Sequence, residues 1–246
     1  MLLARLFGAC VGCLAILWGL AVLPGMWRQS PGERIATRLI AGESFRRTEL
    51  VEQLYRIEPA DPAAACRSLS ARSAAIIRLR LAEDSIAAGE RELIDADIES
   101  LQRTIRSALA CSPSEPMLWF MLYWTEATLN GFSPDYFAYL AMSYRLGPNE
   151  GWIALERNRF AFAVYEYLPK NLAEAAVNEF VGLLKTGRLY AQSVEIFAGP
   201  ARRAREAILP RLVEVGPRER QAFARALHSA GYDIAIPGTE PPKPRG

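Results

Sequence analysis

Residues 91–111 read RELIDADIESLQRTIRSALAC, and the spacing of their apolar side chains predicts the fold class. Five of these side chains follow one another at intervals of 4, 3, 4 and 3: Ile94, Ile98, Leu101, Ile105 and Ala108. This spacing places all five on one face of an α-helix. A second long helix is expected over residues 62–88, and Gly89 stands between the two. We therefore expect an antiparallel helical hairpin that turns near Gly89.

The rest of the chain is predicted to be helical as well. No segment shows the sustained alternation of apolar and polar residues that marks a strand. Glycine and proline residues divide the chain into further helices. These helices are expected over roughly residues 30–42, 48–58, 114–130, 134–146, 149–168, 170–186, 189–197, 201–214 and 217–230. The predicted fold class is all-α.

Two helix junctions in the middle of the chain resemble each other. Pro113 and Pro148 lie 35 residues apart, and each is followed by a tryptophan, Trp119 or Trp152. A tetratricopeptide repeat has a period of about 34 residues, two antiparallel helices and a closing proline. The interval from Pro113 to Trp119 fits this pattern, whereas Trp152 comes two residues too early. We therefore expect a tetratricopeptide-like array of hairpins, clearest over residues 62–168.

The amino-terminal segment, residues 6–27, contains no charged residue over 22 positions. As a helix it is long enough to cross the hydrocarbon core of a bilayer, which takes about 20 apolar residues. A secretory signal peptide has a shorter apolar core, of roughly 7–15 residues, and a small-residue cleavage site. We expect an uncleaved membrane anchor over residues 1–29, with a cleaved signal sequence as the alternative. A helical domain over 30–232 and a flexible, proline-rich tail over 233–246 complete the predicted organisation.

The charge of the chain gives no reason to expect a nucleic-acid partner, and it does not decide on which side of the membrane the domain lies. The net charge is +2, so the chain offers no bulk positive charge for nucleic acid, and no nucleic-acid partner is expected. Arg5 precedes the apolar segment, and five arginines follow it between Arg28 and Arg47. This count favours a cytoplasmic domain, although long domains translocate largely regardless of charge.

Two cysteines outside the apolar segment predict a disulfide. Cys66 lies 23 residues before Gly89 and Cys111 lies 22 residues after it. In a hairpin that turns at Gly89 the two residues are level, where their Cα atoms can approach the roughly 5.5–6 Å that a disulfide requires. Such a bond persists only in an oxidising compartment. Two buried free thiols are the alternative.

No motif in the chain predicts catalysis, a metal or a cofactor. His228 is the only histidine, and its place near the end of the last helix suits the helix dipole. The acidic residues between Glu90 and Glu99 are spread over several faces of a helix, so metal binding is the minority interpretation. Nucleotide-binding, metalloprotease and serine-hydrolase motifs are missing from the sequence.

Two surfaces are candidate sites for a partner. Residues 119–167 contain 14 of the 24 aromatic residues, and a core between stacked hairpins is the favoured interpretation. The members expected at the surface, where they can form a platform for a partner helix or a sugar, are Trp124, Tyr136 and Tyr139.

Residues 185–225 contain nine Lys and Arg against four Asp and Glu. Arg202, Arg203 and Arg205 are the candidate contacts there for phospholipid head groups or an acidic polymer, with a solvated helix face as the alternative.

The chain resembles a family of accessory proteins encoded in bacterial exopolysaccharide loci. The resemblance rests on five helix-junction features: Cys66–Arg67, Cys111–Ser112–Pro113, Trp119, the run from Arg145 to Trp152, and Arg157. It covers roughly residues 30–230. It implies one amino-terminal anchor in the inner membrane, through residues 6–27, and a tetratricopeptide-like domain that faces the periplasm. It also implies a role in polysaccharide assembly or export, without a defined catalytic activity or active-site residues.

Three functions follow from these observations. The first is a non-enzymatic scaffold or accessory protein of envelope or exopolysaccharide assembly, with protein partners and polysaccharide as candidate ligands. The second is a general envelope scaffold unrelated to polysaccharide. The third is a glycan-acting enzyme that uses a carboxylate pair such as Glu126 and Glu156, because glycoside hydrolysis needs two carboxylates across a cleft.

Overall fold

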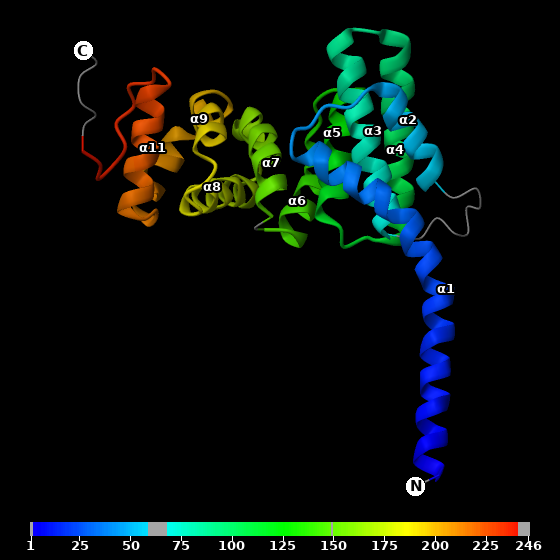
Figure 1. Cartoon of the computed structure of the whole chain (residues 1–246). Helices are drawn as coiled ribbons and strands as arrows, with labels where there is room; N and C mark the ends of the chain where they lie inside the picture. Colours follow the sequence, from blue (N-terminus) through cyan, green and yellow to red (C-terminus); the bar gives the residue numbers. More distant parts are fainter. Residues whose placement is uncertain (1, 59–67, 149, 241–246) are drawn as a thin grey trace. The chain divides into compact units, whose positions relative to one another are not determined.

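The computed structural model of the chain describes residues 2–58, 68–148 and 150–240. These residues form helices joined by short turns, with no strand among them, which confirms the all-α prediction. They group into two compact units, residues 1–113 and 114–246, which are described separately (Figure 1). The sequence-based boundaries at 29/30 and 232/233 stay predictions.

The described residues of the first unit form four helices. They are α1 (Leu2–Ile40), α2 (Arg47–Ile57), α3 (Ser68–Ala88) and α4 (Arg91–Cys111). Gly89 adopts a positive φ of 72° between α3 and α4, a conformation that glycine reaches without steric cost. The two helices pack against each other, and Ile98, Leu101 and Ile105 of α4 are buried. The hairpin predicted from the apolar spacing of residues 91–111 is therefore confirmed over its described part.

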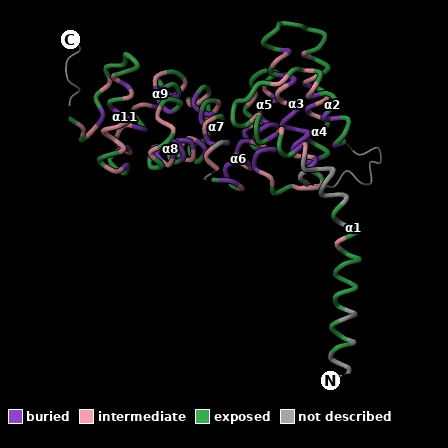
Figure 2. The backbone as a smooth tube through the Cα atoms, viewed as in Figure 1, coloured by how far each residue is buried: buried purple, intermediate pink, exposed green. Residues whose placement is uncertain are grey.

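A small apolar core holds α1 and α2 on α3. Its buried residues come from α2 and α3 and are Leu50, Leu54, Ile57, Ala74, Ile77 and Leu81. Three partly buried side chains pack against them: Ile35, Leu39 and Phe45. Within the first unit, buried residues are densest in α3, whereas the described residues in the first half of α1 are mainly exposed (Figure 2).

Two arginines add ion pairs and hydrogen bonds to this apolar packing. Arg47 of α2 forms an ion pair with Asp97 of α4 at 2.8 Å and donates to the hydroxyl of Ser85 at 3.1 Å. Arg78 of α3 pairs with Glu58, just beyond α2, at 2.5 Å. Each of these arginines retains at least a fifth of its side-chain surface exposed, so water and salt reach both pairs.

The structure corrects the predicted membrane anchor. A crossing helix needs about 20 consecutive, predominantly apolar residues. Although α1 is 39 residues long, no helix within the described residues combines the required length and apolar character. This finding contradicts the anchor over residues 1–29 and the single-pass inner-membrane localisation with a periplasmic domain. The expected start of a separate helix at Ser30–Pro31 is also wrong, because α1 continues without interruption to Ile40.

The predicted disulfide falls partly outside the described residues. The prediction places Cys66 level with Cys111 in the hairpin, but Cys66 lies outside the described residues, and α3 is described from Ser68 onward. Cys111, the last residue of α4, is disulfide-bonded. The pairing of Cys111 with Cys66, and the oxidising compartment inferred from it, therefore stay predictions.

The second unit is a succession of shorter helices. Its elements are α5 (Pro116–Asn130), η2 (Pro134–Tyr136), α6 (Phe137–Leu146), α7 (Gly151–Ala163), η3 (Tyr165–Tyr167), α8 (Lys170–Lys185), α9 (Tyr190–Ala198), η4 (Pro200–Ala204), α10 (Arg205–Arg211), η5 (Leu212–Glu214) and α11 (Pro217–Ser229). Four buried rings from α7, α8, α9 and α11 contact one another with centroids 5.5–6.2 Å apart: Phe162, Phe180, Phe197 and Phe223. Their contacts form the apolar centre of this half of the unit. Packing of this kind does not by itself establish the predicted tetratricopeptide-like arrangement.

Candidate functional site

Three aromatic rings form a row at the surface of α5 and α6. Trp119 of α5 stacks on Tyr139 of α6, with ring centroids 6.2 Å apart and planes 23° apart. Tyr139 stacks in turn on Tyr136, at 6.4 Å and 9°. All three residues are half-buried. We call them the aromatic row.

Local sequence positions the row. Gly131, at a φ of 77°, ends α5, and the hydroxyl of Ser133 accepts from the backbone N–H of Asp135. Pro134 then starts the turn that leads into α6, where a fixed φ suits the first helical position. Tyr136 and Tyr139 are three residues apart and therefore lie on the same side of this short helical stretch.

Two of the three aromatic residues that the sequence predicted at the surface belong to the aromatic row. Tyr136 and Tyr139 lie side by side, as a surface platform requires, whereas Trp124 is half-buried on α5 and belongs to no ring pair in the described structure. Trp119, which was not among the aromatic residues expected at the surface, is the third member of the row. Its partner Tyr139 lies 20 positions further along the chain, so spacing within a single helix could not reveal the contact.

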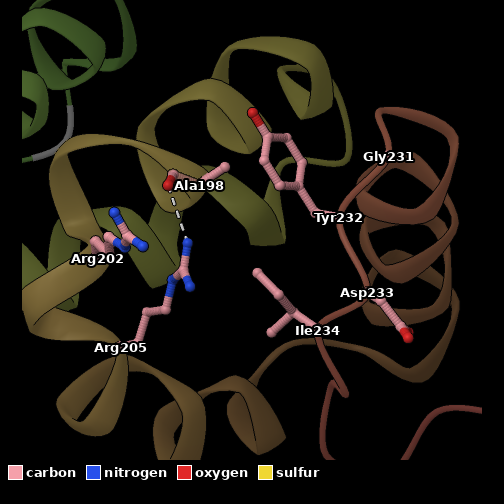
Figure 3. Close-up of a pocket in the computed structure, with 7 residues that line it drawn as sticks. All are labelled: Ala198, Arg202, Arg205, Gly231, Tyr232, Asp233 and Ile234. Atoms are coloured by element: carbon pink, nitrogen blue, oxygen red, sulfur yellow. Dashed lines mark hydrogen bonds between the residues drawn. The ribbon is translucent and has the colours of Figure 1, made fainter.

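The three predicted arginines separate into two environments. Arg203 forms an ion pair with Glu166 of η3. Arg202 and Arg205 instead line a hollow of about 350 Å³ together with Ala198, Tyr232 and Ile234. Figure 3 shows Arg202 beside Arg205, with Ile234 pointing from the opposite wall towards Arg205.

Arg205 is held in place by the end of α9. Its Nε donates to the carbonyl of Phe197 at 3.2 Å, and one Nη donates to the carbonyl of Ala198 at 2.9 Å. Its guanidinium also lies 5.3 Å from the centroid of the Phe197 ring. The last carbonyls of a helix lack intrahelical partners, and an arginine can satisfy them. Burial lowers the pKa of Arg205, and the positive charge of Arg202 lowers it further.

A helix-terminating motif supplies the far wall of the hollow. Gly231 follows α11 at a φ of 93°; its N–H donates to the carbonyl of His228, and the N–H of Tyr232 donates to that of Leu227. This is the Schellman pattern, which reverses the chain after a helix. The reversal brings Tyr232 and Ile234 opposite the arginines. The chain then stays attached to α11 as far as Glu240, whose N–H donates to Gln221 at 2.9 Å.

A fully buried arginine forms a separate polar centre, the Arg157 centre. Nε of Arg157, in α7, donates to Glu179 of α8 at 3.1 Å, and its two Nη groups donate to the Ser143 hydroxyl at 2.9 Å and the Gly147 carbonyl at 2.7 Å. The guanidinium also lies 4.2 Å from the centroid of the Tyr144 ring. Burial raises the pKa of Glu179 above its ordinary value, and the attraction of Arg157 opposes this effect. These partners satisfy the buried charges within the protein, which indicates a structural role for the centre.

The other predicted chemical residues lie apart from these surfaces. Glu126 is buried in α5 and accepts from the amide of Asn130 at 3.0 Å, whereas Glu156 is exposed on α7 and lies 4.0 Å from Arg159. Glycoside hydrolysis places two carboxylates at one cleft, and these two occupy different environments. His228 is half-buried near the end of α11. Within the described parts of the chain, no group of metal-ligating side chains is placed to hold an ion.

Comparison of the chain with protein-family models, with curated proteins and with solved structures finds no match.

Proposed function

We propose that this chain is a non-catalytic helical scaffold of bacterial exopolysaccharide assembly and that it binds a protein partner through the aromatic row. The observation that carries the proposal is the stacking of Trp119, Tyr139 and Tyr136 outside the core. Tryptophan and tyrosine dominate the binding energy of protein interfaces, because they bury a large area and keep a polar group. The exopolysaccharide setting comes from the resemblance of the helix junctions to accessory proteins of such loci.

The row has the properties that an interface anchor needs. Each ring is supported by its neighbour, and an aromatic pair contributes about 0.5–1.5 kcal/mol beyond the area that it buries. The rings are therefore held in position before a partner arrives, which reduces the entropy lost on binding. Because each ring keeps part of its surface exposed, a partner can bury the remainder.

Complementation of a gene deletion tests this proposal. We expect the deletion strain to lose exopolysaccharide output and the wild-type chain to restore it. Tyr139→Ser removes the central ring of the row and should fail to restore output, with the protein level unchanged. Tyr55→Ser is the matched control, because Tyr55 is 88% exposed on α2, outside the row.

The same assay separates the alternatives. If Glu156→Gln abolishes output while the protein stays folded, the chain acts as an enzyme and the scaffold proposal is wrong. Unchanged polymer output in the deletion strain would instead remove the polysaccharide setting and favour a general assembly scaffold.

A further inference from the structure

The hollow beside α9 holds two positive charges that the described structure does not neutralise. Arg202 makes no ion pair and no side-chain hydrogen bond with any described residue, and Arg205 contacts only backbone carbonyls and the ring of Phe197. Asp233 is the one acidic residue of the lining, and Figure 3 shows its carboxylate pointing away from the arginines. Two adjacent guanidinium groups repel each other unless an anion lies between them.

The fixed geometry of Arg205 favours a bound anion over a merely solvated surface. Two bonds to the end of α9 and the contact with Phe197 immobilise its side chain. Its second Nη group donates to no described atom, so its protons remain available to the hollow. An arginine held in this way loses little conformational entropy when it binds a ligand.

The opposite wall indicates what kind of anion fits. Tyr232 is 42% exposed, and the partly buried side chain of Ile234 projects into the hollow, so both present apolar surface to a ligand. A volume of about 350 Å³ lies at the lower end of the range for small-molecule sites. The two adjacent guanidinium groups can share a single carboxylate, with one oxygen on each. A carboxylate carried on a small apolar body satisfies all of these conditions.

We propose that the hollow binds a small apolar carboxylate, with its oxygens on Arg202 and Arg205 and its apolar part against Tyr232 and Ile234. The site is independent of the aromatic row, and neither proposal requires the other. The ligand can be a free organic acid or the carboxyl-terminal residue of a peptide, because both present the same chemistry. Guanidinium groups pair with carboxylates through parallel hydrogen bonds, which gives the site its selectivity for an acid over the matching amide.

Titration of the full-length chain with phenylacetate tests the site. With isoleucine methyl groups labelled by ¹³C, we expect a saturable shift of the Ile234 methyl signal, identified by its loss in Ile234→Val. Phenylacetamide, which has the same shape without the charge, should cause no saturable shift. A peptide with a free carboxyl-terminal phenylalanine, compared with its amidated form, distinguishes the two sources: tighter binding of the free-carboxyl peptide than of phenylacetate identifies a peptide end.

Two neighbouring arginines provide a matched pair of variants. Arg202→Gln removes one proposed ligand contact, and we expect it to weaken phenylacetate binding about tenfold or more. Arg203→Gln makes the same charge change one position away, on a side chain that pairs with Glu166 and does not line the hollow, and it should change binding less than about twofold. The proposal is wrong if the two variants weaken binding equally, if phenylacetamide binds as well as the acid, or if phenylacetate causes no saturable shift.

Discussion

Replacement of Arg157 by methionine should destabilise the second unit strongly. The substitution retains an unbranched side chain but leaves the carboxylate of Glu179, whose side chain is 3% exposed, without its cation. It also removes the donors to the hydroxyl of Ser143 and the carbonyl of Gly147. Breaking a buried ion pair by removing one partner costs about 3–5 kcal/mol. Since a domain is stable by only about 5–15 kcal/mol in total, this loss is a third of the stability or more.

Two measurements check the magnitude. Urea unfolding of the full-length chain gives the loss of free energy, and hydrogen exchange of peptides from α7 and α8 assigns that loss to the second unit. Because α3 and α4 belong to the other unit, their exchange should stay unchanged. The double variant Arg157→Met with Glu179→Met replaces both charges, and apolar replacements of a buried pair are often neutral. It should therefore be more stable than Arg157→Met alone.

Either of two results would refute this account of the Arg157 centre. A loss below about 1 kcal/mol for Arg157→Met would show that the pair contributes no more than a surface ion pair. A double variant whose loss equals the sum of the two single losses would show that Arg157 and Glu179 are not coupled.

Three further predictions concern the same unit. Because the pKa of Glu179 is raised above its ordinary value of 4.5, the folded chain binds more protons than the unfolded chain between these two pKa values. The free energy of unfolding should fall as the pH rises through this window. In urea titrations, Glu179→Gln should not show this fall, because the residue that titrates has been removed. Gly147→Ala places a Cβ 2.6 Å from Cγ of Pro116, so urea unfolding should show a loss of about 1–3 kcal/mol; an unchanged stability would contradict the contact. Gly182→Ala meets no atom within 4 Å inside α8 and should instead stabilise the chain by about 0.5–1 kcal/mol in the same assay.

Local patterns in the sequence predicted the helices well. The apolar spacing of residues 91–111 matches α4 from Arg91 to Cys111, and residues 170–186 match α8 within one residue. The break expected at Ser30–Pro31 was wrong, because proline removes one backbone hydrogen bond but does not force a helix to end. The next turns of α1 pack on α2 and α3 through Ile35 and Leu39. This burial compensates for the lost bond, and it depends on contacts that the local sequence does not contain.

The candidate sites depend on contacts between distant parts of the chain. The basic composition of residues 185–225 indicated a charged surface, but it could not separate Arg203 from its two neighbours. That separation depends on Glu166, 37 residues away, and on the reversal at Gly231 that brings Tyr232 to the hollow. Arg157 appeared in the sequence only as part of a helix-junction resemblance. Its burial follows from the packing of α6, α7 and α8 around it.

The different exposure of the ion pairs makes the two units respond differently to ionic strength. The pairs that attach α2 to its neighbours, Arg47–Asp97 and Arg78–Glu58, are partly open to solvent, so dissolved ions weaken them. Arg157 and Glu179 have side chains that are 0% and 3% exposed, and ions do not reach them. A rise in salt concentration therefore weakens the attachment of α2 in the first unit, whereas the buried ion pair between α7 and α8 stays intact.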